Sequence, residues 1–237
     1  MQRLARYARG AVELHITPCV VTMPPACDRL CVPSNERLVG TQFAHFPVGG
    51  PTPVAERIGE AALPDRYREA SRMLYQCESV DGAVTEFGGA AQEAATLAHA
   101  PIVGGTEAHP VRCPTGAAVL VPSAGAFARV FRRGLVLAVP PFWPGAPTDA
   151  WRRDLGAAYG SAFDLGCDGG AALATPLMGA GARGAPLVEA ADAAADAAAA
   201  FVEHGARTSD ARVLFAVLDD DVADVLDAAL SRALRRR

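Results

Sequence analysis

The sequence contains no lysine, so all 22 of its basic residues are arginine. A guanidinium stays protonated and cannot form a Schiff base or act as a general base in the way that lysine does. A Walker A nucleotide hydrolase is excluded as well, because its phosphate loop requires a lysine. These functional classes are therefore ruled out before any motif is considered.

Cysteine spacing and charge exclude further classes. The six cysteines are scattered over 237 residues without a C-x-x-C pair. This favours free, mostly buried thiols in a reducing compartment over a metal site. The formal net charge of −4 argues against a general nucleic-acid binder, whose basic surface would neutralise phosphates. We therefore expect no metal and no general nucleic-acid binding.

Long apolar runs are also missing, because none reaches the length of a membrane span. The first ten residues, MQRLARYARG, are basic and free of acids, which hints at organelle targeting. Strand-like sequence begins at Val12, however, and leaves little room for a transit peptide. We expect a monomer that is cytoplasmic and does not bind a membrane, with an organelle or the nucleus as alternatives.

The order of the apolar segments indicates the fold class. Strand-like runs alternate with helix patterns, and most of the runs are apolar throughout. Such strands are typical of a sheet covered on both faces, so we predict an α/β fold with three α/β/α layers. We predict a single domain over residues 1–237, interrupted by an inserted loop and helix excursion at 36–79. The clearest strand-like runs are AAVLVP, RGLVLAVPPFW, GAALATPLM and RVLFAVLD.

Two of the helix patterns make detailed predictions. VDGAVTEFGGAAQEAATLAHA is expected to form a helix interrupted at Gly88–Gly89. DAWRRDLGAAYGSAFDLG is expected to form an amphipathic helix that Asp149 can cap. Its buried face is expected to carry Trp151, Leu155, Ala158 and Ala162.

A glycine-rich loop between a buried strand and an alanine-rich helix is the main candidate site. It fits the pattern G-x-G-x-x-G through Gly179, Ala180, Gly181, Ala182, Arg183 and Gly184. Glycines let backbone N–H groups approach an anion, and the start of the following helix adds unpaired donors and its dipole. The loop therefore predicts a phosphate site, with a chance or close-packing loop as the alternative in so alanine- and glycine-rich a chain.

The position of this loop argues against a dinucleotide site of the Rossmann type. That loop joins the first strand to the first helix of its domain and needs several more strand–helix units after it. Here only about one strand and one helix remain. The phosphate interpretation survives, whereas an NAD-dependent oxidoreductase becomes the least favoured alternative.

Seven stretches, taken in chain order, share a likeness with one known family: VELHITP, CDRLCVPSN, VDGAVTEFGGAAQE, VRCPTGAAVLVP, VLAVPPFW, PLMGAGARGAP and RVLFAVLDDDVADVLDAAL. Together they resemble the macro domain, a family that binds ADP-ribose and in some members hydrolyses ADP-ribosyl linkages. PLMGAGARGAP is similar, without a gap, to Pro-Ala-Ile-Ser-Thr-Gly-Val-Tyr-Gly-Tyr-Pro. The resemblance covers nearly the whole chain and implies a macro-domain fold with a central mixed sheet.

The resemblance also implies a ligand and a site. The ligand would be ADP-ribose or an ADP-ribosylated protein or small molecule, and no cofactor is implied. By position, the backbone of residues 179–184 would bind the phosphates and Asn35 would lie near the distal ribose. Asp81 stands where hydrolytic members place an acid that orients or activates water, a role that suits a carboxylate. The alternatives are a helix N-cap for Asp81 and a turn residue or cap for Asn35.

Several positions depart from the family pattern. His15 replaces an aspartate that bonds the adenine amino group; an imidazole nitrogen could accept that bond, but a core or surface histidine is the alternative. Val32 replaces the earlier asparagine of the family loop, Thr85 replaces a helix histidine, and Leu218 stands where an aromatic contacts the nucleoside. The excursion at 36–79 is expected to lie over or beside the ligand cleft, because both its ends belong to site-forming loops.

The resemblance leaves the activity open. Binding of ADP-ribose with hydrolysis through Asp81 is the first hypothesis. A catalytically inactive reader of ADP-ribose or of another nucleotide diphosphate is the second, together with a module for protein interactions.

Overall fold

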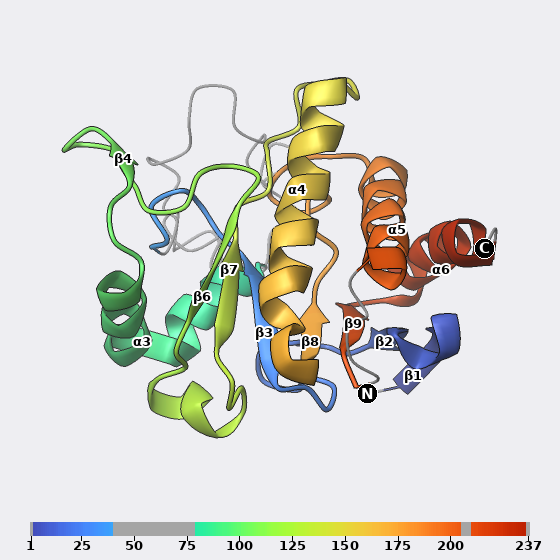
Figure 1. Ribbon diagram of the computed structural model, residues 1–237, viewed down its shortest axis with the longest axis horizontal. Helices are drawn as coiled ribbons and strands as arrows, with labels where there is room; N and C mark the ends of the chain where they lie inside the picture. Colours follow the sequence, from blue (N-terminus) through green and yellow to red (C-terminus); the bar gives the residue numbers. More distant parts are fainter. Residues whose placement is uncertain (1, 40–78, 205–209, 236–237) are drawn as a thin grey trace, which may run out of the picture.

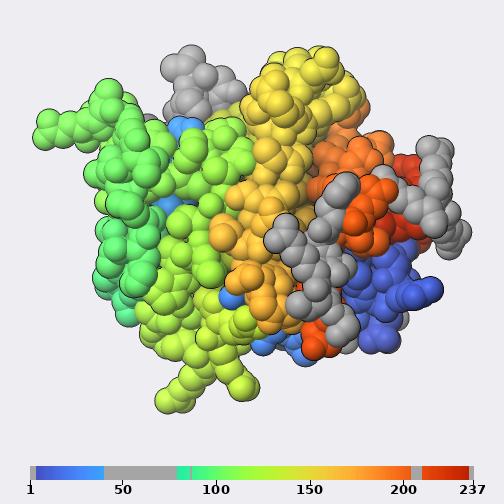
Figure 2. All heavy atoms as spheres, in the orientation of Figure 1, coloured from blue at the N-terminus to red at the C-terminus, as the bar shows by residue number. Residues whose placement is uncertain are grey.

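The computed structural model of the protein describes residues 2–39, 79–204 and 210–235. This part of the chain builds a seven-stranded sheet with the order β1-β2-β9-β8-β3-β7-β6. A separate two-stranded hairpin, β4 (Gly104–Gly105) and β5 (Pro110–Val111), projects from the body (Figures 1 and 2). The sheet strands are β1 (Gln2–Tyr7), β2 (Val12–Ile16), β3 (Arg29–Pro33), β6 (Ala118–Val121), β7 (Leu135–Ala138), β8 (Ala172–Thr175) and β9 (Arg212–Val217).

The sheet is mixed, as predicted. Its five inner strands, β2, β9, β8, β3 and β7, run parallel, and the outer strands β1 and β6 pair antiparallel with their neighbours. The carboxyl ends of the five parallel strands therefore share one edge of the sheet. In open parallel sheets, this is the edge at which ligands bind.

Helices cover both faces of the sheet, which confirms the three-layer prediction. One hydrophobic cluster joins the sheet to α4 (Asp149–Gly166), α5 (Leu187–His204) and α6 (Asp220–Arg235), and Figure 1 shows α4 and α5 in front of the strands. A second cluster on the other face includes Val84 of α3 (Val80–His99).

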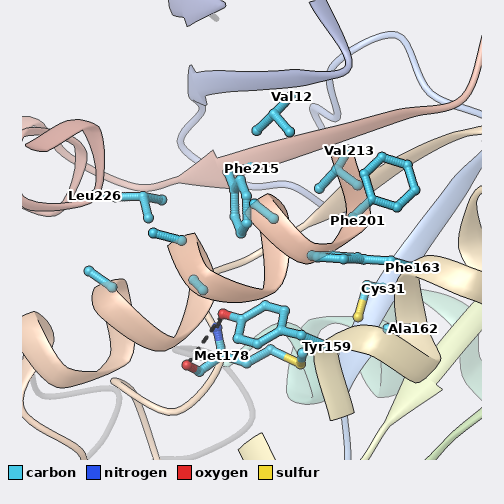
Figure 3. Close-up of a cluster of buried hydrophobic side chains, with 14 of the residues drawn as sticks. Val12, Cys31, Tyr159, Ala162, Phe163, Met178, Phe201, Val213, Phe215 and Leu226 are labelled. Atoms are coloured by element: carbon cyan, nitrogen blue, oxygen red, sulfur yellow. Dashed lines mark hydrogen bonds between the residues drawn. The ribbon is translucent and has the colours of Figure 1, made fainter. Parts of the chain in front are cut away.

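The layer of α4 and α5 is built from small and aromatic side chains. The predicted face of α4 is buried, including Trp151, Leu155, Ala158 and Ala162. Alanines of α5 allow a close approach to the sheet, and the space that remains is filled by rings, including Tyr159, Phe163 and Phe215 (Figure 3). The cap of α4 differs from the prediction, because Thr148 accepts the hydrogen bond from the Trp151 N–H at 3.1 Å and Asp149 is the first helical residue.

Helix α3 is interrupted where the sequence predicts. Gly89 has φ 53° and ψ −160°, a conformation open essentially to glycine alone. A Cβ on Gly88 would lie 2.7 Å from Gln92 of the same helix and from Phe127, so this adjacent glycine permits the close approach of both side chains. The pair of glycines therefore bends α3 over the second hydrophobic cluster.

Strand β1 and the small hairpin are not among the predicted elements. The basic segment at the N-terminus, interpreted as a hint of targeting, forms β1 at the edge of the sheet. Edge strands carry charged residues because one side of their backbone faces solvent, so their apolar pattern is weak. Residues 40–78 lie outside the described part of the chain, and the predicted excursion at 36–79 and its position beside a cleft stay predictions.

The cysteines that the structure describes are unpaired. Cys31, Cys113 and Cys167 are buried, whereas Cys19 and Cys27 are partly buried. This agrees with the expected free thiols. Among the described helices, none is long and apolar enough to cross a membrane.

Candidate functional site

The glycine-rich loop leaves the carboxyl end of β8 and leads into α5. Gly179 and Gly184 have φ values of 97° and 80°, which favour glycine. The Gly184 N–H donates to the Gly181 carbonyl at 2.9 Å, and the Ala185 N–H donates to the Gly179 carbonyl at 3.0 Å. These bonds close the loop on itself, which places its central residues at the surface of the sheet edge.

Three successive backbone donors in this loop are available to a ligand. Within the described part of the chain, no hydrogen bond uses the N–H groups of Ala180, Gly181 and Ala182. Gly181 is exposed, and a Cβ built on it would meet no atom within 4 Å. The start of α5 follows directly, so its dipole and first N–H groups lie beside the loop. Such an arrangement can bind an anion.

The core fixes the beginning of the loop through Tyr159. The Met178 N–H donates to the Tyr159 Oη at 2.7 Å, and this hydroxyl lies 3.5 Å from the Met178 carbonyl that accepts from it (Figure 3). Burial raises the pKa of the Tyr159 hydroxyl, which therefore stays protonated. The residue before Gly179 is thus held by a fully buried side chain of α4.

A serine joins the loop to the predicted acid. The Ser34 Oγ donates to Asp81 Oδ1 at 3.1 Å, and the Ser34 carbonyl accepts from Arg183 Nη2 at 2.6 Å. Ser34 itself is held beyond the end of β3 by its N–H, which donates to the Ala138 carbonyl at 2.7 Å. The structure therefore brings together the glycine loop, the end of β3 and the start of α3. Ser34 was missed from the sequence, although it directly precedes Asn35.

Asp81 is a buried acid in the first turn of α3, 8% exposed. The N-cap of this helix is Ser79, whose hydroxyl accepts from the Gly82 N–H at 3.0 Å. Asp81 is therefore not the N-cap of α3, and its carboxylate accepts from Ser34 instead. The Thr85 hydroxyl donates to the Asp81 carbonyl at 2.9 Å, so the residue that replaces the family histidine bonds to its own helix.

Asn35 shapes the loop that follows β3. Its Nδ2 donates to the Val39 carbonyl at 2.6 Å, and its Oδ1 accepts from the Arg37 N–H at 3.0 Å. This is a turn formed by a side-chain amide, the alternative weighed from the sequence. The expected place of Asn35 near a ribose stays a prediction.

His15 is buried on β2 beside Glu13, whose carboxylate also contacts arginines of β1 and β9. Its Nε2 lies 2.9 Å from Glu13 Oε2, and the same carboxylate binds Arg6 at 3.1 Å and Arg212 at 3.7 Å. In the sheet order, β9 separates β2 from β8, which carries the glycine loop. The contact with Glu13 accounts for a histidine in the core, and the expected contact of His15 with adenine stays a prediction.

The structure also shows where two further residues that depart from the family pattern lie. Val32 is fully buried in the core of β3, so it offers no side chain to a ligand. Leu218 follows β9 at the carboxyl edge and is 63% exposed. Phe142, which was not predicted, lies beneath the Arg183 guanidinium with 4.0 Å between Cζ and the ring centroid.

No group of three or more histidine, cysteine, aspartate or glutamate side chains that could hold a metal occurs within residues 2–39, 79–204 and 210–235.

Comparison with solved structures identifies the fold. A macrodomain of Oceanobacillus iheyensis with ADP superposes with a TM-score of 0.62 and 15% identity over 100% of this chain and 97% of that chain. The macro domain of ganglioside induced differentiation associated protein 2 gives 0.55 and 19% over 97% and 88%. A Trypanosoma brucei macrodomain in complex with ADP gives 0.57 and 16% over 92% and 68%.

No family model and no curated protein sequence matches the chain. The likeness is therefore one of structure, and the protein has the macrodomain fold, as the resemblance of its motifs predicts.

Proposed function

We propose that the protein binds ADP-ribose, free or attached to a protein or small molecule, at the carboxyl edge of its sheet. The observation that carries this proposal is the row of N–H groups at Ala180, Gly181 and Ala182, which no hydrogen bond among the described residues uses, beside the start of α5 and Ser34. A diphosphate is the part of ADP-ribose that such donors recognise. The two ADP-bound macrodomains that share the fold support the same ligand class.

The contacts of Ser34 suggest how the ligand would be oriented. Phosphates on residues 180–182 would lie next to Arg183, whose guanidinium reaches the Ser34 carbonyl. A ribose that extends from the phosphates towards α3 would then approach the Ser34 and Asp81 side chains. The adenosine end would extend the other way along the sheet edge, towards β9 and β2.

Calorimetric titration with ADP-ribose, NAD and AMP tests the binding proposal. We expect micromolar binding of ADP-ribose. Gly181→Glu should weaken it by at least about 100-fold, because a carboxylate would stand against the phosphates and several charge-assisted hydrogen bonds would be lost.

Gly104→Glu is the matched control. A Cβ at Gly104 also meets nothing within 4 Å, and this glycine lies in the projecting hairpin. Unchanged ADP-ribose affinity in Gly181→Glu would show that the loop is not the phosphate site. Absence of ADP-ribose binding in the wild type would refute the proposed ligand.

A second candidate function is hydrolysis of an ADP-ribosyl linkage. It is favoured by the Asp81 carboxylate, which is buried, ordered by Ser34 and close to the proposed ribose position. A carboxylate so held can orient or deprotonate a water molecule, an effect worth about 100-fold or more in rate.

The assay uses an ADP-ribosylated protein and the Asp81→Asn variant. We expect this variant to keep its affinity for ADP-ribose and to lose at least about 100-fold of the hydrolysis rate. Equal rates in variant and wild type would exclude Asp81 from the chemistry. A wild type that binds ADP-ribose without hydrolysing any linkage would be the reader considered from the sequence.

A further inference from the structure

The Arg183 side chain lies across the proposed site. Its Nη2 donates to the Ser34 carbonyl at 2.6 Å, and its Cζ is 4.0 Å from the centre of the Phe142 ring. The Arg183 carbonyl accepts from the N–H of Trp143 at 2.9 Å, so both the backbone and the side chain contact the segment after β7. The guanidinium is thus held in one place before any ligand arrives, which lowers the entropic cost of using it.

The positive charge of Arg183 matters because the proposed phosphate site lies near the negative charge of Asp81. Asp81 shares Ser34 with Arg183, since the hydroxyl of Ser34 contacts the carboxylate and its carbonyl contacts the guanidinium. A carboxylate repels a diphosphate that approaches it, and a helix start supplies only about half a positive charge. The formal net charge of −4 gives no general attraction for anions either. The Arg183 guanidinium places a positive charge at the loop, and Ser34 links it to Asp81.

We propose that the Arg183 guanidinium, held between Ser34 and Phe142, determines specificity by favouring ligands with two linked phosphates over a nucleotide with one phosphate and over a nucleoside with none. The proposal rests on the proposed function, because it assigns a side chain to the same phosphate site. It goes further in that the loop acts through a side-chain charge as well as through its backbone. The family sequence that the loop resembles has tyrosine at this position, so the proposed recognition of charge would distinguish this chain from that sequence.

The test compares Arg183→Gln with wild type, using ADP-ribose, AMP and adenosine at low and high salt. We expect Arg183→Gln to weaken ADP-ribose by about 30-fold and AMP by less, because a hydrogen bond to a charged group is lost together with the Coulomb attraction. Adenosine affinity should change by less than about twofold, and the salt dependence for ADP-ribose should become shallower. Equal losses for all three ligands would mean that Arg183 only supports the loop.

Three further variants separate charge from structure. Arg183→Lys keeps the charge without the planar fork and should lose about fivefold for ADP-ribose. Arg183→Tyr restores the family residue and should match Arg183→Gln in its loss of charge discrimination. Arg132→Gln removes a charge from an exposed residue before β7, at the opposite edge, and should leave every affinity unchanged. A comparable loss in Arg132→Gln would point to net charge rather than to Arg183.

Inorganic pyrophosphate makes the two proposals separable. We expect it to shift the amide resonances of residues 180–182 in wild type, and to do so much less in Arg183→Gln. A wild type that binds pyrophosphate but not ADP-ribose refutes the proposed ligand and leaves the role of Arg183 standing. Equal pyrophosphate affinity in both proteins overturns the role of Arg183, whatever happens with ADP-ribose. No binding of either compound overturns both.

Discussion

Two arginines at opposite edges of the sheet differ in their contacts. Arg29 begins β3 at the amino edge, is 6% exposed and donates to the carbonyls of four residues. These carbonyls belong to Arg133, Leu165, Gly166 and Asp168. Arg183 lies at the carboxyl edge, is partly exposed, and contacts the Ser34 carbonyl and the Phe142 ring. Arginine thus satisfies backbone carbonyls at the amino edge, whereas at the carboxyl edge we propose that it recognises an anion.

The two edges also differ in how far their backbone groups are hydrogen-bonded. At the amino edge, the Ala172 N–H donates to Asp28 Oδ2 at 2.9 Å, and Arg29 satisfies the last carbonyls of α4. At the carboxyl edge, the N–H groups of residues 180–182 are left without a described partner. Backbone groups that a fold leaves unused at its surface are the ones that a ligand can use. The comparison therefore predicts that stability and affinity can be changed separately.

Removal of Arg29 should have the largest effect on stability. Arg29→Met should lower the free energy of unfolding by about 3 kcal/mol, because several buried carbonyls lose their donor at once. Urea denaturation measures this change, with the exposed Arg132→Met as a control that should stay within about 0.5 kcal/mol. The folded variant should bind ADP-ribose as wild type does. A large loss of affinity would break the separation of the two edges.

Removal of the Tyr159 hydroxyl should lower both the stability of the protein and its affinity for ADP-ribose. Tyr159→Phe removes the acceptor of the buried Met178 N–H and should cost about 2 kcal/mol of stability. Because Met178 precedes the glycine loop, ADP-ribose affinity should fall several-fold as well, which calorimetry can measure. Tyr7→Phe is the matched control, since it removes a hydroxyl that bonds Asp227 between β1 and α6. Unchanged affinity in Tyr159→Phe would mean that the loop keeps its shape without this anchor.

The buried thiol of Cys31 should make the free energy of unfolding fall at alkaline pH, by less than the two changes above. Burial raises the pKa of Cys31 from 9.0 to about 12. The neutral thiol therefore contributes stability that is fully present below pH 9 and is lost as the pH rises towards 12, because the unfolded chain releases this proton first. At pH 10 the loss is about 1.4 kcal/mol.

Unfolding free energies of wild type and Cys31→Ala between pH 8 and pH 10 test this prediction. The variant starts from a lower value because a core atom is removed, so the comparison is made on the slope with pH. The slope of Cys31→Ala should be the shallower one. Parallel slopes would mean that Cys31 does not titrate differently in the folded and unfolded protein.

Much of the fold could be predicted because local signals coincide with it. The alternation of apolar runs with helix patterns predicted the layers, and Gly88–Gly89 predicted the break in α3. The alanine-rich helix after the glycine loop is α5. Strand β1 was not predicted because an edge strand needs few apolar residues. The cap of α4 was assigned to Asp149 instead of Thr148 because both residue types are good caps and they stand at neighbouring positions, so the sequence does not distinguish them.

The candidate site was predicted in part for a related reason. Residues 179–184 are adjacent in sequence, so their spacing alone indicates a loop with exposed donors. The resemblance marked Asp81 and Asn35 by position, without showing what either side chain contacts. Asn35 builds a turn and His15 pairs with Glu13, and both contacts depend on backbone geometry that a motif does not specify.

The sequence by itself determined which chemistry is available: arginine as the only strong cation, a glycine loop that precedes a helix, and an acid at the start of another. Only the tertiary structure decided that these meet. Ser34 touches Asp81 across 47 positions and Arg183 across 149, and Phe142 completes the contact. Such contacts follow from the order of strands in the sheet and from where helix α3 begins. They arise from the packing of the whole chain, which no local stretch of residues encodes.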